Sequence, residues 1–242
     1  MILGFSTGCL YKNIEPISIE AVNSIKSTNC NAIELCASFK ERVYQLNSIN
    51  KSDLKNFDYI SLHAPDDITY DDSQNARTIL EEIAKQHEKL NFDLIVVHGH
   101  NITFRNTFKR YNLPIAIENH DKFYGKNVEE MGLVFKKLDT NMVLDVLHSY
   151  IAGGSSKLTD ELYSRFKERI VQIHLSGLGK HDDSQQHYPI NETKQEDILN
   201  SVPKNLPVII ESAFPKYQNL DILLNELKTE YSYVNNYLTR KM

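Results

Sequence analysis

Short apolar runs recur along the chain, and longer stretches with apolar residues at helical spacing separate them. The runs predict strands over residues 2–6, 32–36, 59–63, 94–98, 114–118, 142–145, 170–175 and 207–211. The helical spacing predicts helices around 17–25, 39–46, 79–90, 104–111, 131–138, 158–166 and 220–231, and a short helix that ends near Val202. Residues 176–193 form the longest polar segment, which we expect to be a loop.

Strands and helices therefore alternate from one end of the chain to the other. Such alternation predicts a parallel sheet with helices outside it. Eight strand–helix units in 242 residues match a single (β/α)8 TIM barrel, a fold of the α/β class, that spans residues 1–242 as one domain. A doubly wound open sheet is the alternative, and the lack of a glycine-rich phosphate loop after the first strand argues against it.

The last residue of each of six consecutive predicted strands can bind a metal ion. These residues are His63, His98, Glu118, Asp145, His174 and Glu211. In a TIM barrel the carboxyl ends of all strands meet at the rim that carries the active site. Side chains alternate along a strand, so Ala116 and Glu118 share the inner face, as do Val143 and Asp145.

Carboxylates crowded at one rim repel one another, and a bound cation relieves that repulsion. Mixed imidazole and carboxylate ligands suit Zn, Mn, Fe or Co better than Ca. His148 follows Asp145 by three residues, so the chain must turn between them for both to reach the rim. The sequence thus predicts a divalent metal site. For any one of these residues alone, a helix cap or a hydrogen-bonded core histidine is the alternative.

Composition limits the partners and the compartment. The chain is 41% hydrophobic and 24% charged, and its formal net charge is −5. It therefore has no basic stripe that would indicate nucleic-acid binding. Cys9, Cys30 and Cys36 lack zinc-ribbon spacing and are expected to be free thiols in a reducing compartment. No segment resembles a signal peptide or a transmembrane helix. We expect a cytoplasmic protein without a membrane partner, and its oligomeric state is open.

With these motifs in place, the chain resembles the xylose isomerase-like TIM barrels. This superfamily includes sugar phosphate isomerases and epimerases and endonuclease IV, also called AP endonuclease family 2. The resemblance covers nearly the whole chain. It rests on HAP at 63–65, VVHG at 96–99, IEN at 117–119, LDVLHSYIAG from Leu144, IHL at 173–175 and IIES from Ile209.

The resemblance implies a ligand set. Its central metal ion, shared by both branches, would be held by Glu118, Asp145, His174 and Glu211. In the endonuclease branch, His63 and His98 would join Glu118 on a second ion. There, His148 would bind a third ion with an aspartate and a histidine from the loop after the seventh strand, where this chain offers Asp182, Asp183 and His187.

This chain departs from the endonuclease pattern at two points. The endonuclease pattern places an aspartate two residues before the loop histidine, where this chain has Gln185. The motif after Glu118 and Asn119 continues with His120, Asp121, Lys122 and Phe123 rather than with small residues. The leading hypothesis is therefore a metal-dependent isomerase or epimerase acting on a sugar, with Glu118 and Glu211 moving the proton through an enediolate.

The alternative is an endonuclease IV-like phosphodiesterase with two or three metal ions, for which DNA would be the substrate. A metal-binding barrel without catalysis is a third hypothesis. Glu34, His100, His148 and Lys180 are the predicted substrate contacts. The number of bound ions separates the first two hypotheses, because one ion favours the isomerase and three favour the phosphodiesterase.

Overall fold

The computed structural model describes residues 1–103, 107–179 and 187–240. Its eight strands form a closed parallel barrel in chain order, which confirms the predicted (β/α)8 fold. The strands are β1 (Leu3–Ser6), β2 (Ala32–Cys36), β3 (Tyr59–His63), β4 (Leu94–His98), β5 (Ile115–Glu118), β6 (Asn141–Asp145), β7 (Ile170–Leu175) and β8 (Val208–Ile210). That the whole chain forms a single domain stays a prediction.

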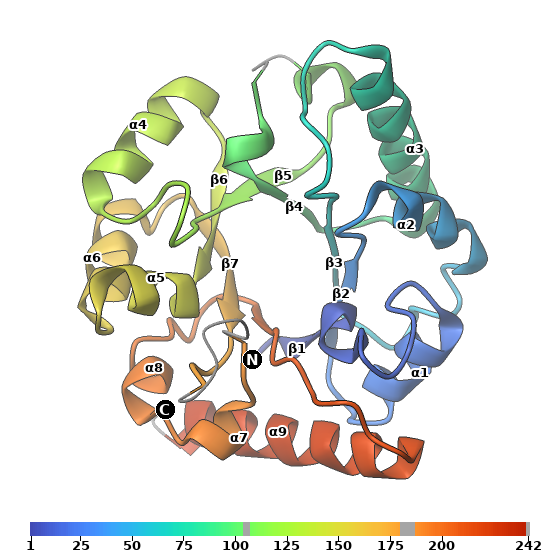
Figure 1. The fold of residues 1–242 in the computed structure, drawn as a ribbon, viewed down its shortest axis with the longest axis vertical. Coiled ribbons are helices and arrows are strands. Elements are labelled where there is room, and N and C mark those ends of the chain that lie inside the picture. The colour runs from blue at the N-terminus through green and yellow to red at the C-terminus, as the bar shows by residue number, and fades with distance from the viewer. Residues whose placement is uncertain (104–106, 180–186, 241–242) are drawn as a thin grey trace.

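Helices surround the barrel, as Figure 1 shows, and the long α9 passes across the bottom of that view. The helices are α1 (Ile19–Lys26), α2 (Lys40–Gln45), α3 (Gln74–Leu90), α4 (Val128–Leu138), α5 (Val146–Gly153), α6 (Lys157–Phe166), α7 (Ile190–Thr193), α8 (Glu196–Asn200) and α9 (Leu220–Arg240). Short 3-10 turns η1 (Thr7–Leu10), η2 (Leu46–Ser48), η3 (Gly99–Asn101) and η4 (Lys109–Tyr111) lie between them.

Local side-chain chemistry sets where several helices begin and end. Ser73 accepts a hydrogen bond from the backbone N–H of Ala76 at the start of α3, and Asn127 accepts one from Glu130 at the start of α4. Asn91 ends α3 with a left-handed backbone at φ 59°, a conformation that asparagine tolerates better than most residues. Side-chain caps therefore fix the first turns of these helices, and a left-handed residue closes α3.

Apolar residues form two separate layers, one inside the barrel and one outside it. Leu94, Val96, Ala116 and Val143 make a small cluster within the barrel. Their neighbours Ile117, Leu144, Ile173 and Ile210 belong instead to the main core between the strands and the helices. The predicted alternation of side chains along β5 and β6 is confirmed, and it directs Glu118 and Asp145 to the inner face.

The predicted helices differ from the observed ones in several places. Of the predicted helix over 104–111, residues 104–106 lie outside the described residues, and the rest carries only the η4 turn. Helix α3 begins five residues before the predicted start, and α7 lies in the segment predicted as a loop. Helix α5 follows Asp145 directly, because that carboxylate caps it, where the sequence analysis expected only a turn. Helix α9 continues beyond residue 231 to Arg240, and the buried Val234 and Leu238 account for its extra length. Among the described residues, no helix combines the length and the apolar character needed to cross a membrane.

Candidate metal centre

Strand register brings the predicted ligands together at one rim. His98 pairs with Glu118 in the β4–β5 ladder, and Asp145 pairs with His174 in the β6–β7 ladder. Each pair therefore sits side by side at the carboxyl ends of its strands. The six predicted strand-end residues divide into two groups that share Glu118.

The first group, which we call the central site, consists of Glu118, Asp145, His174 and Glu211. Its ligand atoms lie within 4.8 Å of one another. Nδ1 of His174 is 2.9 Å from Oε1 of Glu118 and 3.2 Å from Oε2 of Glu211. Oδ2 of Asp145 is buried and has no hydrogen-bond partner in the described part of the chain. An orphaned carboxylate oxygen beside three other donors fits a bound divalent cation.

A further carboxylate, that of Glu34, contacts His174 from deeper in the barrel. Glu34 is fully buried, and its Oε2 lies 3.1 Å from Nε2 of His174. The same oxygen accepts hydrogen bonds from Ser61 Oγ at 2.9 Å and Gln172 Nε2 at 2.8 Å. A proton on Nε2, facing Glu34, leaves Nδ1 of His174 free to bind a cation.

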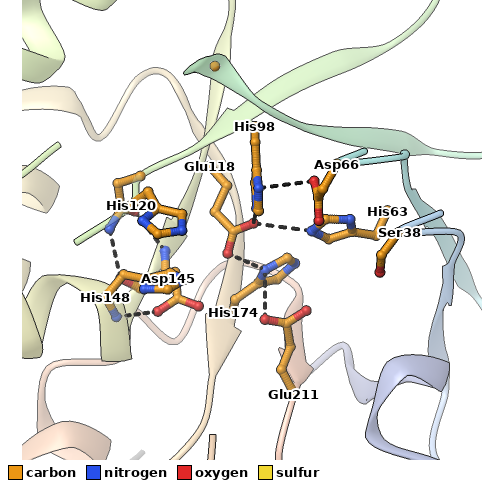
Figure 2. Close-up of polar contacts among 12 residues, drawn as sticks. Ser38, His63, Asp66, His98, Glu118, His120, Asp145, His148, His174 and Glu211 are labelled. Atoms are coloured by element: carbon orange, nitrogen blue, oxygen red, sulfur yellow. Dashed lines mark hydrogen bonds and ion pairs between the residues drawn. The ribbon is translucent and has the colours of Figure 1, made fainter. Parts of the chain in front are cut away.

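The second group, which we call the side site, consists of His63, Asp66 and His98. Nε2 of His98 is 3.1 Å and Nε2 of His63 is 3.4 Å from Oε2 of Glu118. Oδ1 of Asp66 lies 3.0 Å from Nδ1 of His98, where a carboxylate can bind the cation or fix the ring. Figure 2 shows His63, Asp66 and His98 together on one side of Glu118, with His174 beneath it.

Glu118 thus presents a different oxygen to each group. Oε1 faces His174, and Oε2 faces His63 and His98. A carboxylate with its two oxygens directed at two sets of donors is placed to bridge two cations.

The charges at this rim shift one another's protonation in the absence of a cation. Burial raises the pKa of Asp145 to about 7, and the nearby carboxylates of Glu118 and Glu211 add to the rise. Burial lowers the pKa of His98, but its contacts with Asp66 and Glu118 outweigh that effect and raise the value to about 9. Without a cation, the rim therefore holds an extra proton on His98, and Asp145 resists ionisation. Bound divalent cations would displace that proton and favour the ionised form of Asp145.

A third group lies beside the first two. His148, at the first turn of α5, approaches Asp121 and His120 of the loop after β5. The sequence instead grouped His148 with Asp183 and His187. Asp183 lies outside the described residues, and Nδ1 of His187 is engaged with Ser176 Oγ at 2.9 Å. The ring centroids of His148 and His187 are 5.6 Å apart, so His187 is a neighbour of this third group without belonging to it.

A cavity of about 300 Å³ opens over the metal-capable groups. Glu118, Glu211, His63, His98 and His148 line it together with residues from the loops after β1, β2 and β8. Among the described residues that line it, none is a lysine or an arginine. The positive charge that an anionic ligand needs here would have to come from cations or from protonated histidines.

The predicted substrate contacts lie in different places. Glu34 is buried beneath His174 and is absent from the described cavity lining. His100 is exposed and stacks on Phe123 with ring centroids 4.1 Å apart. Lys180 lies outside the described residues. Contacts of Glu34, His100 and Lys180 with a substrate stay predictions.

Sequence reasoning missed Asp66, His120 and Asp121. All three follow a strand-end residue by two or three positions, where the chain has already left the strand and period-two alternation no longer applies. The sequence did carry one signal for His120 and Asp121, because they replace the small residues of the endonuclease pattern after Asn119.

Two further residues fix the rim. Asn119 accepts a hydrogen bond from the backbone N–H of Asp145 at 2.8 Å and donates one to its carbonyl at 3.0 Å. The hydroxyl of Tyr124 accepts from the N–H of Gly99 at 2.6 Å and donates to the carbonyl of Glu118. The ends of β4, β5 and β6 are therefore tied to one another by side chains.

Comparisons with solved structures show the same fold. The chain is similar to a D-tagatose 3-epimerase-like protein, at 16% identity and TM-score 0.64, over 98% of this chain and 99% of that one. It is also similar to endonuclease IV from Thermus thermophilus, at 13% identity and TM-score 0.65, over 96% and 99%. A third similar structure is the probable 3-DHS dehydratase AsbF from Bacillus anthracis, at 14% identity and TM-score 0.67, over 94% and 98%.

No protein-family model matches the chain, and no curated protein matches it in sequence. The similarity to these solved structures supports the TIM-barrel fold. By their names, these similar structures belong to proteins with different reactions.

Proposed function

We propose that this protein is a metal-dependent phosphodiesterase that uses at least two divalent cations bridged by Glu118. The observation that carries the proposal is the division of the Glu118 oxygens between His174 and the pair His63 and His98. One structural neighbour is an endonuclease, which by its name cleaves phosphodiesters.

Cations bound at these groups would supply Lewis-acid stabilisation of the charge on the phosphoryl oxygens and would lower the pKa of a water molecule. The chain itself contributes positioning. Ser6, Ser38 and Tyr11 line the cavity and offer hydroxyl donors to a phosphate oxygen. The Glu211 side chain is 15% exposed and lines the cavity, so its carboxylate can accept a proton from the attacking water.

The experiment uses the cation-loaded protein with two probes, bis(4-nitrophenyl) phosphate and an oligonucleotide duplex that contains one abasic site. We expect hydrolysis of at least one of them, dependent on added Zn²⁺, Mn²⁺ or Co²⁺ and lost in Asp66→Asn and His98→Ala. No hydrolysis of either probe at full cation loading would contradict the proposal. Cleavage of the duplex would identify DNA as the substrate, whereas cleavage of the small ester alone would not.

A sugar epimerase is the second candidate, and a specific observation favours it. Glu118 and Glu211 both approach Nδ1 of His174, so two carboxylates face one point from different strands. Such an arrangement can remove a proton from a carbon and return it on the other side. Entry of solvent deuterium into a ketose, lost in Glu118→Gln and in Glu211→Gln, would favour this reaction over the first.

We also propose that the protein acts in the cytoplasm. The three cysteines are buried and free. Free thiols are typical of a reducing compartment.

A further inference from the structure

Two loops that are distant in sequence place His120, Asp121 and His148 against one another. His120 and Asp121 come directly after β5, and His148 lies in the first turn of α5. Oδ1 of Asp121 is 2.7 Å from Nδ1 of His148 and 3.3 Å from Nδ1 of His120. The two imidazole rings are stacked, with centroids 4.5 Å apart and planes at 20°. Figure 2 shows His120 and His148 adjacent, on the side of Glu118 away from His63.

The atoms that converge here meet in a contact of poor hydrogen-bond geometry. The side chains of Asp121 and His148 are 5% and 9% exposed. Oδ1 of Asp121 and Nδ1 of His148 form an ion-pair contact at 2.7 Å, and in the described part of the chain neither atom has a partner in hydrogen-bond geometry. A cation held between them would bind both atoms in place of this contact.

The same arrangement occurs at the side site. There Oδ1 of Asp66 lies 3.0 Å from Nδ1 of His98, also without hydrogen-bond geometry. The two groups are contiguous, because the rings of His98 and His120 have centroids 5.5 Å apart. A third group built like the second and placed beside it extends the row of ligand-type residues along the rim.

We propose that His120, Asp121 and His148 form a further divalent-cation site, with both of its additional ligands supplied by the loop after β5. His148 lines the cavity, whereas His120 and Asp121 are absent from its described lining, so the cation would be held behind His148. Nδ1 of His120 accepts a hydrogen bond from the N–H of Lys122 at 3.0 Å, an exposed contact that the cation would replace. The site concerns cation binding and does not depend on which reaction the rim performs.

The loop that holds the ligands is itself fixed. The backbone N–H of His120 donates to the carbonyl of Tyr124 at 2.9 Å, and Tyr124 in turn holds the ends of β4 and β5. The backbone N–H of His148 donates to Oδ1 of Asp145 at 2.6 Å. Both sides of the site are therefore anchored to the barrel before any cation binds.

The test counts cations in the purified full-length protein after reconstitution with Co²⁺ alone, by elemental analysis and by calorimetric titration. We expect Asp121→Asn and His120→Ala each to lose about one equivalent of Co²⁺ per chain relative to wild type, with the remaining equivalents bound as before. Glu129→Gln, on the exposed first turn of α4, is the matched control and should keep the wild-type stoichiometry.

Wild-type stoichiometry in both His120→Ala and Asp121→Asn would overturn the proposal. Loss of one equivalent in Asp183→Asn, with none lost in His120→Ala, would also overturn it, because the cation would then be held by the loop after β7. His120 is only partly buried, so its variant keeps the test decisive if Asp121→Asn fails to fold. The readout is stoichiometry, so its failure is distinct from an absence of phosphodiesterase activity.

Discussion

Glu34 lies directly beneath His174, with its Oε2 3.1 Å from Nε2 of the ring. Both side chains are fully buried inside the barrel. Burial opposes ionisation of Glu34, but its contact with His174 outweighs this effect and lowers the pKa of the carboxyl to about 2. When a cation binds Nδ1 of His174, the ionised carboxylate of Glu34 would hold the remaining ring proton on Nε2.

Glu34→Gln should therefore weaken cation binding at the central site by about 10–100-fold, because an amide does not hold the ring nitrogen with a full charge. Titration of the protein with Zn²⁺ against a chelating indicator measures this. Asp93→Asn is the matched control, since Asp93 is exposed and its side chain bonds the N–H of Ile60 away from the rim. Equal Zn²⁺ affinity in Glu34→Gln and wild type would rule out the orienting role.

Asp145→Asn should remove the central cation while the barrel stays folded. The amide oxygen can still accept the hydrogen bond from the N–H of His148 that caps α5, so the helix start is preserved. The lost group is the anionic oxygen that has no other partner among the described residues. Elemental analysis checks the cation content, and circular dichroism checks the fold. A full cation complement in the folded variant would show that the central site lies elsewhere.

Asp66→Asn and His98→Ala should separate the two candidate reactions. Both changes affect the side site and leave the four residues of the central site in place. A phosphodiesterase that needs both cations should lose most of its turnover, whereas an epimerase that uses only the central cation should keep its deuterium exchange. The ratio of the two activities in each variant, relative to wild type, is the measurement.

Cation affinity should rise steeply with pH. In the cation-free protein, contacts with Asp66 and Glu118 raise the pKa of His98 to about 9, although burial opposes this, so a proton competes for its ring nitrogen at neutral pH. The contribution of His98 should therefore make the affinity increase as the pH rises toward about 9. The raised pKa also stabilises the cation-free fold at low pH, and this contribution is lost as the pH rises through about 9.

Calorimetric titrations with Zn²⁺ in buffers of different ionisation enthalpy measure the protons released on binding. We expect net proton release at pH 7 that decreases as the pH rises through about 9. His98→Ala should release fewer protons than wild type. Binding without proton release at pH 7 would contradict the expectation that a proton competes with the cation for the ring nitrogen of His98.

The barrel and the gathering of ligand-type residues at its rim could be predicted from the sequence because both depend on periodicity. Alternation along β5 to β8 decides which side of the strand Glu118, Asp145 and His174 occupy, and parallel strands bring their ends to one rim. Register then places Asp145 beside His174 without any further information. These relationships follow from the strands alone.

Loop residues could not be placed in the same way. Asp66, His120 and Asp121 reach the rim through turns whose dihedral angles no repeating pattern specifies. Glu34 lies two residues before the end of β2, so the alternation places it below the rim but does not show which side chain it meets. Its place beneath His174 depends on the side chain of Gln172, which belongs to the opposite part of the barrel.

The side chain of Asn119 makes one backbone amide at the rim a reporter of how often β5 and β6 separate there. Its side-chain amide accepts from the N–H of Asp145 and donates to the carbonyl of the same residue, so it extends the β5–β6 ladder by one step made from a side chain. The Asp145 amide hydrogen is buried behind this pair and can exchange with solvent only when the side chain of Asn119 swings away. Hydrogen exchange at this single amide would therefore report how often the ends of β5 and β6 separate.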